Sequence, residues 1–453
     1  MWCGGLRESV SGGVAALTRR RLIAAGGAAL GGAALAACGR ASAPPPAPGA
    51  PSDAFTGGGA LSILLNSHFI PAYDAWVDKW AAEWGAQHKV DVSADHILSA
   101  QLAEKIAAEV AAQAGHDVIR FTRAGELPLY HEHLVEVGEQ AKQIGQRHGW
   151  VNPLAEQMGM YQGVWKGLPE YFLEFSASYR KDLFDQNGLK PVDTWDDLLK
   201  AGSVLKGKGN PIGIAINQKS NDANVSWLSL LWGYGASYVG KDGKTITINS
   251  PETKQALKLA LELYSKAMTN EVLSWDDTGN NQFLASGRGA WIHNPISGLR
   301  TIEKQDPELA KKIALSNVPA GPKGRLVTGS SSTLSIMKWA KSVPAAKAFL
   351  SGYFGSYLDA VKASEGYNQP VLQEFRKKPM AILGEDPRFH FLQDWHEYFR
   401  VFSYPGPPTP AAGEVESNWI IPLMVARAVT DGNVDGAVSW AEQKLKAIYA
   451  KHK

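Results

Sequence analysis

Apolar residues beyond position 60 alternate between short continuous runs and longer segments with helical spacing. The run at 60–65 predicts a strand, and the tryptophans that follow it recur at every fourth position, as on one face of a helix. Further strands are predicted at 90–92 and 117–119, with a helix at 102–112 between them. This strand–helix–strand–helix–strand order favours a parallel sheet, because each helix returns the chain to the same edge.

Two short segments follow strands of this predicted sheet at their carboxyl ends. They are residues 66–69, after the first strand, and 120–123, after the third. In open α/β sheets, ligands bind beyond the carboxyl ends of the strands. We therefore expect both segments to border a binding site.

The stretch 167–195 combines the aromatic residues of a core strand with the acidic residues of a surface strand. Aromatic and small residues alternate over 171–179, which predicts a strand, yet Glu170 and Glu174 accompany it. A short helix is predicted at 181–186. We interpret the strand as a segment that crosses between two lobes and passes the floor of a ligand cleft.

The rest of the chain continues the alternation of strands and helices. Strands are predicted at 211–215 and 289–292 and from 334 onward, and helices at 225–233, after Pro251, at 345–353 and over most of 420–449.

Residues 1–38 have the pattern of an export signal. A basic segment with Arg19 and Arg20 precedes a Gly- and Ala-rich apolar run, which is too short for a membrane-spanning helix. The arginine pair resembles a twin-arginine signal. The run ends at Cys38 in a sequence that resembles a lipobox, where the cysteine would be lipidated. Residues 39–59 are rich in Pro and Gly and are predicted to be a tether.

Composition narrows the classes of function. A net charge of +2 argues against a general nucleic-acid binder. The only cysteines are Cys3 and Cys38, so the exported domain would have no disulfide and no thiolate metal site. We expect no metal and no cofactor. The 15 tryptophans suit a site that stacks flat ligands, or a core.

Motifs for catalysis are weak. No G-x-S-x-G sequence occurs, and Gly243-Lys244 lacks the upstream glycine of a phosphate-binding loop. The spacing of His131-Glu132-His133 differs from the helical H-E-x-x-H zinc arrangement. Paired carboxylates always permit a glycoside hydrolase, which is therefore the alternative function, although the expectation is that the chain is not an enzyme.

Several motifs, in this order, resemble those of the extracellular solute-binding proteins of ABC importers, in the class that includes maltose- and other sugar-binding proteins. The resemblance covers nearly all of 60–450. It is carried by GHDVIRF at 115–121, the run from Gly167 to Ala201, QFLASGRGAWI at 282–292, NVPAGPKGR at 317–325, AAKAFLSGYF at 345–354 and SEGYNQPV at 364–371.

This resemblance implies a periplasmic-binding-protein-like α/β fold, with two α/β lobes joined by three crossing segments around an interlobe ligand cleft. The crossings would lie near Phe175, near Val318 and at 353–360. The first lobe would then comprise 60–175 and 319–353. The second would comprise 176–318 and 354–453.

Matching the family's motif positions one at a time implies a set of cleft residues. They are His68, Phe69, Phe121, Arg123, Glu170, Tyr171, Glu174, Asp222, Asn224, Trp275, His293, Asn294, Tyr367, Asn368 and Trp419.

Alternatives stay open for several of these residues. His68 could be a loop histidine bonded to the local backbone. Glu170 and Glu174 could form interlobe salt bridges instead of accepting hydrogen bonds from sugar hydroxyls. Asp222 and Asn224 could cap a helix.

Two other positions have equally ordinary explanations, since Phe121 could be core and Arg123 a solvated charge. At Ile296 the chain departs from the maltose-binding type, which carries a stacking tryptophan there. The expected replacements are Trp275, Trp419 and Tyr367.

The expected function is capture of a small solute, most simply a mono- or oligosaccharide, and its delivery to an ABC permease in the membrane. A polyamine or a peptide is the alternative solute. The expected protein is an exported monomer, lipid-anchored to the outer face of the bacterial cytoplasmic membrane through Cys38, without nucleic acid as a partner.

Overall fold

The computed structural model describes residues 55–383 and 386–452. The predicted signal of 1–38, the lipidation at Cys38 and the tether as far as residue 54 lie outside these residues. Within them, no helix has both the length and the apolar character needed to span a bilayer.

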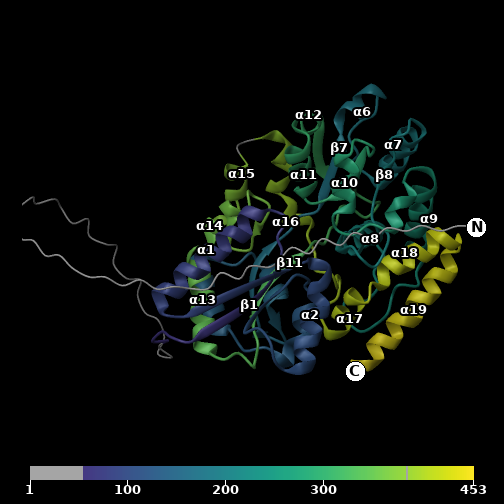
Figure 1. The fold of residues 1–453 in the computed structure, drawn as a ribbon. Coiled ribbons are helices and arrows are strands. Elements are labelled where there is room, and N and C mark those ends of the chain that lie inside the picture. Colours follow the sequence, from purple (N-terminus) through teal and green to yellow (C-terminus); the bar gives the residue numbers. More distant parts are fainter. Residues whose placement is uncertain (1–54, 384–385, 453) are drawn as a thin grey trace, which may run out of the picture. The chain divides into compact units, whose positions relative to one another are not determined.

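A six-stranded sheet organises the first lobe, in the order β12-β6-β11-β3-β1-β2. Two of its strands, β1 and β11, are labelled in Figure 1. The predicted parallel part is confirmed: β1 pairs in parallel with both β2 and β3. The other three strands join in antiparallel fashion. The strands are β1 (Ala60–Asn66), β2 (Asp91–Ile97), β3 (Val118–Phe121), β6 (Leu168–Phe172), β11 (Ser331–Ile336) and β12 (Gln369–Pro370).

Helices and a small ribbon accompany this sheet. The tryptophan-bearing helix is α1, whose Trp80 packs edge-on against Phe349 of α13, with ring centroids 4.9 Å apart. The elements are α1 (Pro71–His88), α2 (Ser99–Ala112), α3 (Glu126–Tyr130), a 3₁₀ turn at His131–His133, α4 (Gly138–His148), α5 (Leu154–Gly159), the ribbon β4 (Met160–Tyr161) with β5 (Val164–Trp165), α13 (Val343–Gly355) and α14 (Tyr357–Ala363).

The second lobe is built on a four-stranded sheet in the order β10-β7-β9-β8. Its strands are β7 (Ser176–Arg180), β8 (Ile212–Gly213), β9 (Trp291–Asn294) and β10 (Ile313–Asn317). Its helices are α6 (Lys181–Gln186), α7 (Trp195–Gly207), α8 (Asn221–Gly233), α9 (Pro251–Lys266), a 3₁₀ turn at Asn270–Leu273, α10 (Gly279–Ala285), α11 (Ser297–Gln305) and α12 (Pro307–Ala310).

The C-terminal segment adds mostly helices to the second lobe. The last two, α18 and α19, pack on each other and on α9. These elements are the 3₁₀ turn Pro387–Gln393 and the helices α16 (Trp395–Tyr398), α17 (Pro410–Ser417), α18 (Ile420–Asp431) and α19 (Val434–Lys451). Before them, the 3₁₀ turn Gln373–Phe375 and α15 (Lys378–Ile382) contact α4 and α14 of the first lobe.

The strand predicted at 171–179 is two strands that belong to different sheets. β6 ends at Phe172 and β7 begins at Ser176. Between the two strands, the backbone N–H of Leu173 donates to the backbone oxygen of Ser330. The crossing itself is therefore residues 173–175. Because pairing stops there, Glu170 and Glu174 do not share one face of a regular strand.

The second crossing joins β10 to β11, from residue 318 to residue 330. The third lies later than predicted. Gln369 and Pro370 pair with β6 of the first sheet, and Arg388 is the point where the chain bonds to Ala310 in the second lobe. Residues 354–372 thus belong with the first lobe, which corrects the predicted boundary at 353. A two-residue strand leaves no periodic signal from which it could be predicted.

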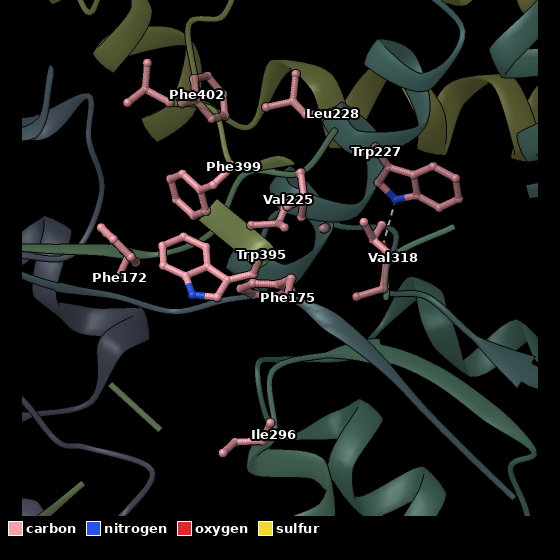
Figure 2. Close-up of a cluster of buried hydrophobic side chains, with 14 of the residues drawn as sticks. Phe172, Phe175, Val225, Trp227, Leu228, Ile296, Val318, Trp395, Phe399 and Phe402 are labelled. Carbon is pink, nitrogen blue, oxygen red and sulfur yellow. Dashed lines mark hydrogen bonds between the residues drawn. The ribbon is translucent and has the colours of Figure 1, made fainter. Parts of the chain in front are cut away.

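Aromatic side chains fill the space around the crossings. Figure 2 shows Phe172, Phe175, Trp395 and Phe399 gathered there, with the rings of Phe172 and Trp395 centred 4.2 Å apart. Many of the tryptophans are core residues of this kind: Trp195, Trp227, Trp232, Trp291 and Trp395 are all fully buried. The high tryptophan content is therefore largely a property of the core.

A buried ion pair fastens β3 to β6. The guanidinium of Arg120 donates two hydrogen bonds to the Glu170 carboxylate, both of 2.9 Å, and neither side chain exposes more than 1%. Tyr73, Tyr353 and Ser332 also donate to this carboxylate. Burial alone would raise the pKa of Glu170, but Arg120 and these hydroxyls outweigh it and hold the pKa below its usual range.

We expect Glu170→Gln to lower the free energy of unfolding by about 3–5 kcal/mol, because it leaves the Arg120 charge buried without its partner. Urea denaturation would measure the loss. Glu262→Gln is the matched control: Glu262 pairs with Lys266 on the surface of α9, and its substitution should leave stability unchanged. Equal losses in the two variants would contradict a special role for the buried pair.

Candidate functional site

A cavity of about 490 Å³ lies between the two sheets, at the carboxyl ends of β1 and β3. The first lobe contributes the segments that follow these strands. The second lobe contributes the start of α8, the loop before α10 and the end of β9, and the crossings contribute Leu173, Phe175 and residues 330–332. This is the position that the parallel-sheet rule predicts for a ligand.

Five aromatic side chains line the cavity: Phe69, Tyr171, Phe175, Tyr367 and Trp419. Trp419 has a left-handed backbone with φ of 56°, which is uncommon for an aromatic residue and is typical of functional sites. The guanidinium of Arg123 lies 5.2 Å from the centre of its indole ring. The cavity thus offers flat apolar faces beside a fixed positive charge.

His68 lines the cavity and is also bonded to its own loop, so both explanations of this residue have a basis in the structure. The Nδ1 atom accepts from the Ile70 N–H at 3.0 Å, which leaves Nε2 to donate to Asn368 Oδ1 at 2.9 Å. Burial lowers the pKa of His68 to about 4. The imidazole is therefore neutral and held in one orientation.

An acidic wall faces the cavity from the second lobe. Asp222 is buried and accepts from Asn280 at 2.6 Å; burial, together with Asp277, raises its pKa well above the usual range. Asp277 accepts from Ser220 and from the Asn221 N–H through Oδ1, and burial raises its pKa too. Both carboxyl groups line the cavity, and the Asp222 oxygen that Asn280 does not contact can accept from a ligand.

Other cavity-lining atoms also lack hydrogen-bond partners among residues 55–383 and 386–452. They are Asn66 Oδ1, Arg123 Nη1, Asn221 Oδ1 and Ser331 Oγ. A buried polar atom without a partner costs free energy, so such atoms mark places where a bound molecule supplies the missing hydrogen bond. The pattern calls for a ligand with several donors and at least one acceptor.

The structure brings eight of the residues expected at the cleft to this cavity. They are His68, Phe69, Arg123, Tyr171, Asp222, Asn294, Tyr367 and Trp419.

Three more expected residues bond to neighbours behind the cavity wall. Asn368 orients His68. Asn224 donates to the Glu416 backbone oxygen at 3.3 Å, and His293 bonds to Ser226 at 2.6 Å. Asn224 and His293 belong to α8 and β9, and their side chains bond within the second lobe instead of lining the cavity.

The remaining four lie in the interior, away from the cavity. Phe121 packs on Tyr130, and Trp275 packs on Phe283. Glu170 is the partner of Arg120 within the first lobe, so the pair is not interlobe. Glu174 is 4% exposed, and burial alone raises its pKa well above the usual range.

Several lining residues escaped sequence reasoning. Asn221 opens α8, Asp277 lies just before α10, and Ser297 opens α11, and at such positions helix capping is the simpler explanation. The serines at 330–332 belong to no sequence motif that would mark them as cavity-lining residues. Within the described residues, no group of His, Cys, Asp or Glu is arranged to hold a metal ion.

Known proteins share this sequence pattern and this fold. A family model for bacterial extracellular solute-binding proteins matches residues 66–354. A probable ABC transporter-binding protein of Deinococcus radiodurans is 26% identical over 230 residues, which are 48% of this chain and 53% of that protein. The chain thus spans about half the length of this curated relative.

Two solved structures have the same fold at 18% sequence identity. One is a sugar transporter from Arthrobacter chlorophenolicus A6 with bound laminaribiose, at a TM-score of 0.74, covering 86% of this chain and 99% of that one. The other is an ABC transporter solute-binding protein from Thermotoga lettingae bound with α-D-tagatose, at a TM-score of 0.72, covering 86% and 100%.

The expected fold is confirmed: two α/β lobes, each with its own sheet, form a periplasmic-binding-protein fold. The family binds solutes and does not transform them, which agrees with the expectation that the chain is not an enzyme. The chain belongs to the bacterial extracellular solute-binding proteins.

Proposed function

We propose that this chain captures a sugar or polyol in the cavity between its lobes and delivers it to the permease of an ABC importer. The observation that carries the proposal is the combination, in one cavity, of aromatic faces with buried polar atoms that have no partner. Sugars present apolar C–H faces and a rim of hydroxyl groups, and they match both features. Related folds carry laminaribiose and α-D-tagatose.

Each lobe supplies a different part of this proposed site. Trp419 and Phe69 offer faces for stacking, and their burial on binding drives association. The carboxyl groups of Asp222 and Asp277 accept hydrogen bonds from sugar hydroxyls, while Arg123 donates to a ring or hydroxyl oxygen. Closing the cleft excludes water and strengthens these hydrogen bonds. A hinge at the crossings allows the solute to enter and leave.

A polyamine or a basic peptide is the alternative solute because of the acidic wall. A protonated amine can donate hydrogen bonds to carboxyl groups just as a sugar hydroxyl can. The guanidinium of Arg123 favours a sugar over these solutes, because it would repel a positively charged ligand in the same cavity.

A panel of sugars, polyols, polyamines and short peptides should separate these solutes by thermal shift. The cognate solute is expected to stabilise the protein by about 2.7 kcal/mol when its concentration is a hundredfold above Kd. We expect the largest shift from a mono- or oligosaccharide. A panel in which only amines shift the transition would refute the sugar proposal, and one without any shift would refute solute capture.

Trp419→Ala is expected to weaken sugar binding about tenfold or more, because a stacked aromatic ring contributes roughly 0.5–1.5 kcal/mol beyond its burial. Trp440→Ala is a matched control: Trp440 lies on α19 outside the cavity and also carries an arginine over its ring, Arg427 at 4.6 Å. Calorimetric titration of both variants would show whether the loss is specific. Equal affinities would exclude Trp419 from the site.

We also propose that Cys38 anchors the chain by a lipid, with residues 39–59 as the tether that places the domain beside its permease. Cys38→Ala should move the protein from the membrane fraction to the soluble extracellular or periplasmic fraction. Cys3→Ala should leave it in the membrane fraction. A membrane-bound Cys38→Ala chain would exclude lipidation at this residue.

A further inference from the structure

A close contact between α3 and α17 joins the two lobes beside the cavity. α3 follows β3 of the first sheet. α17 is held to the second lobe on both sides, by Phe402 packed on Tyr238 and by α18 packed on α8. At the contact, Gly125 and Gly413 meet so closely that a Cβ on either residue would strike the backbone of the other.

Two buried carboxyl groups lie in this contact. Glu416 of α17 is 5% exposed, and its Oε2 accepts from the Gly125 N–H at 3.1 Å. Glu126 of α3 is 2% exposed and accepts from the N–H groups of Thr122 and Arg123 at 2.9 and 3.1 Å. The carboxyl group of Glu416 thus bonds across the lobes, whereas that of Glu126 bonds to the backbone just before its own helix.

The charges around Glu416 do not balance. From the first lobe, Arg123 and Glu126 face it, with opposite charges. From the second lobe its titratable neighbour is Tyr238, which interacts in turn with Tyr449 of α19. The charge of Arg123 therefore acts on both carboxyl groups, without a direct ion pair to either among the described residues. The same guanidinium lies beside the indole ring of Trp419 in the cavity.

Burial raises the pKa of Glu416 to about 8; Arg123 opposes this shift, and Glu126 adds to it. Burial raises the pKa of Glu126 as well. A separation of α3 from α17 would return the Glu416 carboxyl group to water, and a carboxyl group in water has an ordinary pKa.

We propose that closure of the cleft takes up a proton at Glu416, so that the contact between α3 and α17 is a pH-sensitive latch on the solute site. The proposal rests on the proposed function for its purpose, since the latch acts on the same cavity through Arg123 and Trp419.

The direction of the pH dependence of closure follows from the linkage between proton binding and closure. The closed form binds the proton more tightly than the open form, so acid favours closure and rising pH favours opening. The effect extends from the ordinary range of a glutamate, about pH 4.3, to about pH 8. Within that window, the ratio of closed to open molecules changes by up to about tenfold for each pH unit.

Hydrogen–deuterium exchange of the full chain tests the latch without any solute. Protection factors, corrected for the intrinsic effect of pH, would be compared at pH 6 and pH 8 for peptides that contain Gly125 and α17. We expect about fiftyfold greater protection at pH 6, because the two pH units lie almost wholly between the pKa of the open form and that of the closed form. A peptide from α9 serves as the internal control and should show no such change.

Glu416→Gln should remove the pH dependence, because the amide mimics the protonated acid and still accepts from Gly125. Glu414→Gln is the matched control: Glu414 lies two residues away on α17 and pairs with Lys451 and His452 on the outer side. It should behave as the unsubstituted chain does. Glu126→Gln removes the repelling neighbour and should move the transition to lower pH.

A pH-independent contact in the unsubstituted chain, or an unchanged pH dependence in Glu416→Gln, would overturn the proposal. Failure of the sugar panel beside a pH-dependent latch would count against the proposed function alone.

Discussion

The ion pair between Arg120 and Glu170 is the constraint on which the cavity depends. A guanidinium and a carboxylate that are both removed from water are tolerated only when each satisfies the other and nearby hydroxyl groups complete the set. Here those hydroxyls come from α1, α13 and β11. Glu170 therefore fixes β6 against β3 and against the helices behind it. Tyr171, the next residue, is held in the cavity wall as a result.

From this fixed floor the first lobe presents aromatic groups and the guanidinium of Arg123, and the second lobe presents Trp419 together with the acids Asp222 and Asp277. The division suits a protein that closes around its ligand, because each lobe alone offers an incomplete set of partners. The polar atoms left over in the cavity, from Asn66 to Ser331, are neither packed away nor paired with each other. A binding protein has reason to keep such atoms unsatisfied, since a ligand gains affinity by completing them.

The contact between α3 and α17 also contains buried charged groups, but these groups do not form a permanent pair. Arg120 forms a direct ion pair with one carboxylate, whereas the charge of Arg123 acts on the carboxyl groups of both Glu126 and Glu416 without a direct ion pair to either among the described residues. The first arrangement is permanent, because neither partner can leave without a large cost. The second depends on a proton, and it lies where the lobes must separate.

Local pattern was enough to predict the start of the first sheet and the short helix at 181–186, because these depend on periodicity and on turn residues within a few positions. The crossing near Phe175 was implied by the family resemblance. Motif order was enough for the fold. His68, Asp222 and Trp419, which were expected at the cleft, lie in segments that border the cavity. Only the tertiary structure decided which side of each segment faces the cavity: Glu170 and His293 point inward while Tyr171 and Asn294, their neighbours, line it. Pairing of Gln369 with β6 and the approach of Glu416 to Gly125 join residues far apart in the chain, and such long-range contacts leave no trace in local spacing.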